Sequence, residues 1–223
     1  MTDHTTTRRA LIAAAGASLA AASFGAPVLA QSKAPTAANL TAEQKALVAQ
    51  ATNYIQGLSS AKGRFIQTDQ RGTVTQGDFY MQRPGRARFA YEGPSGLLVV
   101  SNGNNVNIFD RRLKTFESYP LSRTPLALLL AREVRLDRGV VITDVRKLAD
   151  GFTIVAQDAK RQTLGRISLD FSDGPVSLIG WTVSDVKGSQ IRVRLVDFEK
   201  TGGLDPKLFV LTDPRPRRAG AKS

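Results

Sequence analysis

From Gly63 onward, apolar and polar residues alternate along much of the chain. The segment RARFAYE places Ala87, Phe89 and Tyr91 on one face and charged side chains on the other, and RISLDF and IRVRLVDF repeat this alternation. A period of two is typical of antiparallel strands with one dry face and one wet face. Further candidate strands span 63–70, 73–82, 97–101, 105–110, 113–119, 141–148, 152–157 and 177–186.

Short turns rich in Gly, Pro, Asn and Asp separate these candidate strands. About ten or eleven strands in hairpin order predict a mainly β fold with short helices, in which one large curved sheet closes on itself like a barrel. The chain contains no visible internal repeat.

Two segments have helical patterns instead. Residues 41–58 have Thr41 as a possible N-cap, Gln44 three residues later as in a capping box, and Gly57 near the expected end. Between strands, SRTPLALLLAREVR predicts a short helix with Thr124 as its cap and Pro125 at its first position. This second helix is apolar nearly all round, so most of its surface must be covered.

The first thirty residues have the features of a secretory signal peptide. A charged start ends in Arg8 and Arg9, an uncharged Ala-rich core follows, and small residues precede an expected cleavage after Ala30. A membrane anchor is the alternative, but the core is weakly apolar and interrupted by Gly and Pro. The two arginines also fit a twin-arginine signal, and the sequence does not decide between that route and ordinary unfolded export.

Cleavage would leave 193 of the 223 residues and reduce the net charge from +12 to +11. We expect a linker at 31–40, one domain at 41–212 and a disordered basic tail at 213–223. The chain has no cysteine, and cleavage removes His4, its only histidine. A Ser-His-Asp triad, a Cys nucleophile and a zinc site built from imidazole or thiolate are therefore excluded. Lipid attachment through a cysteine is excluded as well, and the mature protein is expected to be soluble.

Four stretches together resemble the periplasmic outer-membrane lipoprotein carrier proteins of Gram-negative bacteria. They are GRFIQ (63–67), GDFYMQRPGRARFAY (77–91), LVVSNGNNVNIFD (98–110) and RTPLALLLAR (123–132). The likeness rests on their order and spacing, from the first helix to Phe209. It implies an incomplete antiparallel barrel whose mouth is covered by a lid made of both helices, around a hydrophobic cavity for lipoprotein acyl chains.

The resemblance also implies site residues. Broad apolar side chains that can point inward by parity are expected to line the cavity: Phe65, Phe79, Met81, Phe89, Tyr91 and Trp181. The alternative is that they form an ordinary core. In the lid helix, the exposed-prone residues are Leu126, Leu129 and Leu130.

Arg83 precedes Pro84, so its strand is expected to end at the sheet rim, near the lid. There a guanidinium could reach the unpaired carbonyls at a helix end. In the resembling family an arginine of this Arg-Pro motif holds the lid shut and lets go when lipoprotein binds; the alternative is a solvated arginine. This chain departs from many members in having Ala87, where an aromatic residue is frequent.

The expected cargo is acylated lipoprotein, received from an inner-membrane lipoprotein-releasing ABC transporter and passed to an outer-membrane acceptor by a monomer without a cofactor. An enzyme would rest on Asp197 and Glu199, which are more often just solvated. A nucleic-acid binder would rest on the charge and on Arg111 and Arg112, but the basic residues are scattered. A general periplasmic lipid-binding or envelope-sensing domain on the same scaffold is the main alternative.

Overall fold

The computed structural model describes residues 38–94, 96–134, 136, 139–160 and 165–215. The predicted signal peptide, most of the predicted linker and residues 216–223 of the predicted tail lie outside the described residues.

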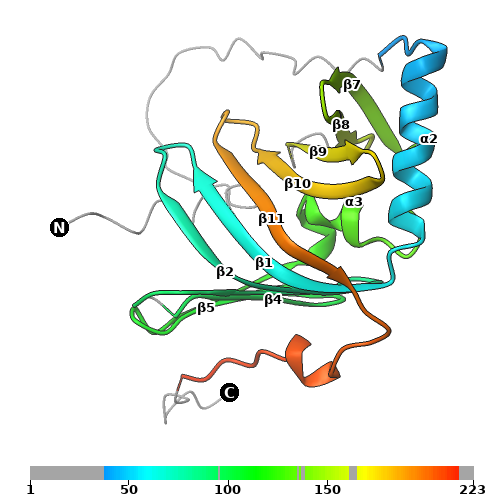
Figure 1. The fold of residues 1–223 in the computed structure, drawn as a ribbon. Helices are drawn as coiled ribbons and strands as arrows, with labels where there is room; N and C mark the ends of the chain where they lie inside the picture. The colour runs from blue at the N-terminus through cyan, green and yellow to red at the C-terminus, as the bar shows by residue number, and fades with distance from the viewer. Residues whose placement is uncertain (1–37, 95, 135, 137–138, 161–164, 216–223) are drawn as a thin grey trace, which may run out of the picture.

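One strongly curved sheet dominates the fold, and helix α2 stands against one end of it (Figure 1). The helical elements are α2 (Ala42–Gln56), η1 (Leu121–Arg123), α3 (Leu126–Leu130) and η3 (Pro206–Phe209). The strands are β1 (Ser60–Asp69), β2 (Val74–Gln82), β3 (Arg86–Tyr91), β4 (Leu98–Asn102), β5 (Asn105–Asp110), β6 (Thr115–Pro120), β7 (Val140–Leu148), β8 (Gly151–Asp158), β9 (Arg166–Asp173), β10 (Val176–Ser184) and β11 (Gln190–Lys200).

Within the described residues the strands form an eleven-stranded sheet in the order β6-β5-β4-β3-β2-β1-β11-β10-β9-β8-β7. Neighbouring strands are antiparallel, and the first strand pairs with the last, as Phe65 opposite Leu195 illustrates. The free edges are β6 and β7, and the chain between them carries η1 and α3. The predicted mainly β fold with an unclosed antiparallel sheet is confirmed.

A bulge in β11 decides which side chains enter the concave face. The register between β1 and β11 shifts between Lys62 and Arg64, and Asp197 opposite this point has a φ of 55°. The extra residue reverses the alternation, so Asp197 is exposed while Phe198 packs on the core and stacks with Phe79 at 6.4 Å between ring centroids. Glu199 also lies at the surface, where it pairs with Lys62 at 3.3 Å.

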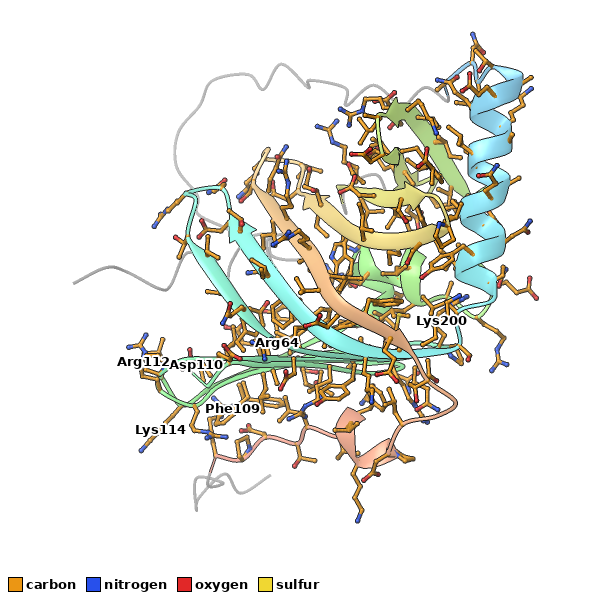
Figure 2. All side chains as sticks on the ribbon, viewed as in Figure 1. Arg64, Phe109, Asp110, Arg112, Lys114 and Lys200 are labelled. Atoms are coloured by element: carbon orange, nitrogen blue, oxygen red, sulfur yellow. The ribbon has the colours of Figure 1, made fainter. Side chains whose placement is uncertain are left out.

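Helix α2 begins with the predicted capping box. The Gln44 backbone N–H donates to Thr41 Oγ1 at 3.2 Å, and the Thr41 N–H donates to Gln44 Oε1 at 2.9 Å. Gly57 is the C-cap, as its position in the pattern predicted. The helix buries Ile55 against the sheet, and the Lys200 ammonium at the end of β11 lies 4.5 Å from the centre of the Tyr54 ring (Figure 2).

Helix α3 starts one residue later than the sequence predicted. Pro125 occupies the N-cap, and Thr124 makes no capping bond to the helix. Its hydroxyl instead donates to the carbonyl oxygen of Leu121 at 2.8 Å, because η1 ends directly before it and leaves that acceptor in reach. The prediction of Thr124 as the cap was therefore wrong, whereas the short apolar helix itself is present.

The chain after β11 folds back across the outer face of β3, β4 and β5 (Figure 1). Phe209 in η3 is buried, and two side chains of the sheet donate to backbone carbonyls beside it in the same segment. Arg88 Nη1 reaches the Leu208 carbonyl oxygen at 3.1 Å, and Asn107 Nδ2 reaches that of Leu211 at 2.9 Å. This segment covers the outer face of the sheet and leaves the concave face to the cavity.

Candidate ligand-binding cavity

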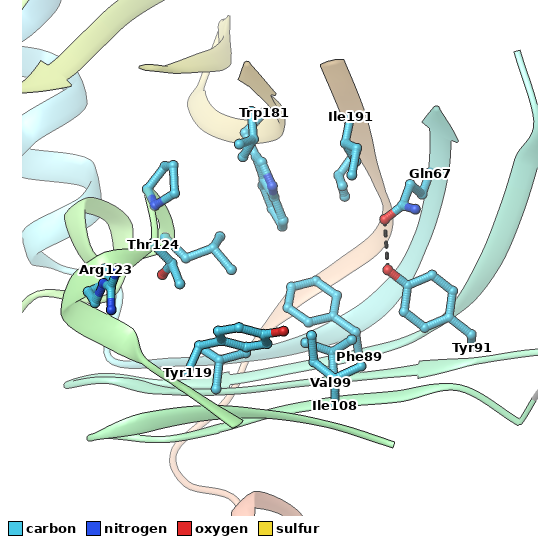
Figure 3. Close-up of a pocket in the computed structure, with 15 residues that line it drawn as sticks. Gln67, Phe89, Tyr91, Val99, Ile108, Tyr119, Arg123, Thr124, Trp181 and Ile191 are labelled. Carbon is cyan, nitrogen blue, oxygen red and sulfur yellow. Dashed lines mark hydrogen bonds between the residues drawn. The ribbon is translucent and has the colours of Figure 1, made fainter. Parts of the chain in front are cut away.

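An apolar cavity of about 50 Å³ lies between the concave face of the sheet and the start of α3 (Figure 3). Strands β1, β3, β4, β5, β6, β10 and β11 contribute inward-facing side chains, and residues 123–126 close one side. The lining residues are Gln67, Phe89, Tyr91, Val99, Val106, Ile108, Tyr119, Arg123, Thr124, Pro125, Leu126, Trp181, Val183, Ile191 and Val193. In this closed form the volume accepts only a few water-sized groups.

Phe89, Tyr91 and Trp181, all expected at a cavity, lie in its wall. Trp181 points from β10 toward Phe89, with the ring centroids 6.0 Å apart in an edge-to-face arrangement (Figure 3). Leu126 of α3 joins the same wall, while Leu129 and Leu130 are buried in the core on the same short helix.

Phe65, Phe79 and Met81 lie behind this wall. All three are buried and belong to the hydrophobic core, but none lines the cavity. The Phe65 ring meets Tyr91 at 4.9 Å and Phe89 at 5.4 Å, and Phe79 meets Phe89 at 5.2 Å. Phe65 and Phe79 therefore support Phe89 and Tyr91 from behind within an aromatic cluster.

Gly77 allows this cluster to form. It is the cross-strand neighbour of Phe65 on one side and of Tyr91 on the other, and it adds no side chain between the two rings. A Cβ at Gly77 would lie 2.0 Å from the carbonyl oxygen of Ala90, closer than any real contact. Strands β2 and β3 therefore approach each other at a distance that only glycine permits.

A buried polar pair interrupts the apolar wall. The Tyr91 hydroxyl donates to Gln67 Oε1 at 2.7 Å (Figure 3). Burial raises the pKa of Tyr91 above its ordinary value, because an ionised phenol would lose its hydration here. Tyr91 therefore stays a neutral hydrogen-bond donor at the pH of any bacterial compartment.

A second polar group of residues lies on the α3 side of the cavity. The Tyr119 hydroxyl donates to Glu117 Oε2 at 2.8 Å, and partial burial together with this carboxylate raises the pKa of Tyr119 to about 12. Arg123 and Thr124 lie on the same side, away from Gln67 and Tyr91 (Figure 3). Between these two ends the wall is apolar apart from the Tyr119 hydroxyl, which points toward Phe89 (Figure 3).

Arg83 lies directly after β2 and contacts the ends of both helices. Its Nε and Nη2 donate to the Ala131 carbonyl oxygen at 3.1 and 2.6 Å, and Nη2 also reaches that of Arg132 at 3.2 Å. Its Nη1 donates to the carbonyl oxygens of Leu58, at 3.3 Å, and Ile55. Partial burial lowers the pKa of Arg83, but arginine keeps its charge. The Ala131, Arg132 and Leu58 carbonyls follow the ends of α3 and α2, where helices leave acceptors without intrahelical partners. Ile55 lies in the last turn of α2, and its carbonyl oxygen also accepts from the Leu58 N–H at 3.1 Å.

Several lining residues are not among the predicted site residues. Ile191 and Val193 belong to an alternating strand, so the period of two already placed them inward. Gln67 shares the parity of Phe65, and the same alternation would have placed it inward despite its polarity. Strands β4 and β5 contain consecutive buried residues on both faces, so alternation gives no clear signal for Val99, Val106 and Ile108.

In the described part of the chain, no group of three or more His, Cys, Asp or Glu side chains could hold a metal ion. Within the same residues, every helix is too short or too polar to cross a bilayer.

The fold and the cavity define a binding protein in which an unclosed β-sheet encloses an apolar pocket. The family of the outer membrane lipoprotein carrier protein LolA matches residues 56–212, and the chain belongs to that family. An outer-membrane lipoprotein carrier protein from Methylococcus capsulatus is 31% identical over 157 residues, covering 67% of this chain and 74% of the relative. Another, from Chromobacterium violaceum, is 25% identical over 82% of this chain and 91% of its own length. A solved LolA superfamily protein from Nitrosomonas europaea has a TM-score of 0.44 and 10% identity, over 75% of this chain and 97% of that chain.

Proposed function

We propose that this protein binds the acyl chains of lipoproteins in its cavity and carries them through the periplasm. It receives them from an inner-membrane lipoprotein-releasing ABC transporter and passes them to an outer-membrane lipoprotein acceptor. The observation that carries this proposal is the apolar cavity between the concave sheet and α3, in a chain of the lipoprotein carrier family.

The energetics of the cargo favour such a cavity. Each methylene removed from water contributes about 0.8 kcal/mol, so an acyl chain needs an apolar enclosure to cross an aqueous compartment. The wall around Phe89, Val99 and Trp181 offers that enclosure. Binding an acyl chain there requires no chemical reaction.

Loading requires the cavity to open. A volume of about 50 Å³ is too small for a long acyl chain, so cargo must displace part of the cover. Leu126, Leu129 and Leu130 on α3 are the side chains that acyl chains would replace, and Arg83 holds the end of that helix in the closed form. The α3 leucines and the acyl chains then compete for the same apolar surface, and this competition allows the cargo to be released again.

Export completes the proposal. Cleavage after Ala30 would deliver a monomer of residues 31–223 to the periplasm. The sequence contains no cysteine, so lipid attachment through a cysteine at the cleavage site is excluded.

The test is to purify the protein from the envelope of its native host and identify by mass spectrometry what accompanies it. Triacylated proteins are the expected result. They should no longer accompany a variant in which a larger side chain fills the cavity. Free phospholipid without lipoprotein would overturn the carrier role and favour a general periplasmic lipid-binding domain.

A further inference from the structure

The outer face of the sheet carries a groove of about 910 Å³ across strands β7 to β11. The central strands of the groove contribute mostly short residues. In the β9–β10 register, for example, Ser168 lies opposite Thr182 and Asp170 lies opposite Gly180, and all four line the groove. The longer side chains of the lining are mainly arginines.

The groove is basic. Its charged lining residues within the described part of the chain are four arginines and two aspartates, which gives a net charge of +2. Arg192 and Arg194 lie two residues apart on β11, and Arg166 lies two strands away on β9; all three are exposed. On β11 the arginines alternate with buried residues such as Ile191, which lines the cavity. The groove and the cavity therefore lie on opposite faces of the sheet.

Arg166, Arg192 and Arg194 have no carboxylate partner among the residues that the structure describes. The cations of the flanking strands β1 and β7 all have one: the pairs are Lys62–Glu199, Arg64–Asp78, Arg64–Glu92, Arg146–Asp144 and Lys147–Asp173. Asp170 in the groove instead accepts from Thr153 Oγ1 at 2.7 Å. Three guanidinium groups are thus left to bind anions from outside the chain.

Exposed apolar side chains lie among these charges. Strand β10 has a bulge between Leu178 and Gly180, and the extra residue, Ile179, is 45% exposed. Leu148 at the end of β7 lines the same groove and is 53% exposed. Exposed apolar groups beside polar ones indicate a surface that contacts a partner.

Two features favour a polypeptide over a lipid surface as that partner. Arg192 and Arg194 repeat every two residues of a strand, about 6.6 Å, which is also the repeat with which an extended chain presents alternate side chains. The described lining contains four arginines and no lysine, and protein interfaces are enriched in arginine and depleted in lysine. A groove also suits a narrow chain better than a flat bilayer.

We propose that this groove docks an extended acidic segment of a partner protein. Carboxylates at alternate positions of that segment bind Arg192 and Arg194, a further carboxylate binds Arg166, and Ile179 packs against an apolar side chain of the partner. Because the groove lies on the face opposite the cavity, the partner stays bound while acyl chains enter or leave. This docking site goes beyond the proposed function.

The test measures, by fluorescence anisotropy, the binding of a labelled ten-residue peptide that alternates Glu with Thr. The wild-type protein should bind it, and should bind the same peptide with Gln in place of Glu at least tenfold more weakly. Arg192→Gln combined with Arg194→Gln should weaken binding of the acidic peptide about tenfold, as the loss of two exposed charged contacts allows. Higher ionic strength should weaken the binding to the wild type.

Arg111→Gln combined with Arg112→Gln is the matched control. It removes the same charge from two exposed arginines in the turn between β5 and β6, outside the groove, and should bind like the wild type. Equal losses in the two double variants would show unspecific attraction and overturn the proposal. Failure of the wild type to bind the peptide would overturn it too. If the wild type instead bound phosphatidylglycerol vesicles, and the Arg192 and Arg194 variant did not, the groove would belong to a membrane surface.

Binding of an acyl probe should be unchanged in both double variants, because neither touches the cavity wall. The docking site and the proposed carrier function can therefore fail independently.

Discussion

The guanidinium of Arg83 donates to the carbonyl oxygen of Ala131 from two of its nitrogens, at 3.1 and 2.6 Å. Ala131 is the C-cap of α3, so its carbonyl has no acceptor role within that helix. The same guanidinium also bonds to the carbonyl oxygen of Leu58, just after α2. One side chain directly after β2 thus joins the ends of α2 and α3.

Replacing Arg83 should therefore favour an open form. Arg83→Leu removes the bonds to both helix ends but leaves the cavity wall unchanged. Loss of a charged hydrogen-bond network of ~1.5–3 kcal/mol shifts a closed–open equilibrium roughly ten- to a hundredfold. The empty variant should bind more of an apolar fluorescent dye. It should still accept lipoprotein but pass less of it to an acceptor, because closure no longer competes with bound acyl chains.

Two variants serve as controls for this prediction. Arg83→Lys keeps the charge without the planar fork and should be intermediate in dye binding. Arg192→Leu removes an exposed arginine from the outer face of β11 and should match the wild type. Unchanged dye binding and unchanged transfer in Arg83→Leu would contradict this prediction and show that Arg83 only caps the helix ends.

The sequence predicted which faces are buried better than it predicted which residues border the cavity. Alternation placed Phe65, Phe79 and Phe89 inward, and all three are buried. Only Phe89 borders the cavity, whereas Phe65, which lies opposite Leu195 in the β1–β11 register, is buried away from it. That pairing joins segments far apart in the chain, and a local period of two contains no information about it.

The polar residues near the cavity differ in how clearly the sequence indicates them. Arg83 could be singled out because its proline neighbour marks a strand end. Gln67 was not singled out, although its parity places it inward, because a lone glutamine in a strand is usually solvated. Its buried hydrogen bond comes from Tyr91, which lies 24 residues along the chain and reaches it from across β2.

Filling the cavity should reduce acyl binding with a small effect on folding. Val183 lines the cavity and is only partly buried, so a phenyl ring at that position has space to enter. We expect Val183→Phe to weaken binding of an acyl probe at least tenfold while costing no more than the ~1–3 kcal/mol typical of overpacking. Probe titration and denaturant unfolding on one sample measure both. Val186→Phe, at a residue 61% exposed, should change neither.

Gly77→Ala should destabilise the protein through the backbone. The new Cβ would lie 2.0 Å from the Ala90 carbonyl oxygen, so β2 and β3 would have to separate where Phe65 and Tyr91 meet. The expected loss is about 2 kcal/mol or more in the free energy of unfolding, comparable with other overpacking. Gly202→Ala is the matched control, since a Cβ there meets nothing within 4 Å. Equal stability of the two variants would contradict the close approach at Gly77.

The buried phenol of Tyr91 should make the protein sensitive to alkaline pH. Desolvation raises its pKa in the folded state above the ordinary value of 10.0, and the unfolded chain keeps that ordinary value. Below pH 10 the phenol is neutral in both states, so its contribution to stability is fully present. As pH rises above 10, the unfolded state ionises first, and the free energy of unfolding falls. Denaturant unfolding between pH 8 and pH 11 should therefore show a steeper loss of stability in the wild type than in Tyr91→Phe. Parallel curves would mean that the folded protein hydrates the Tyr91 hydroxyl.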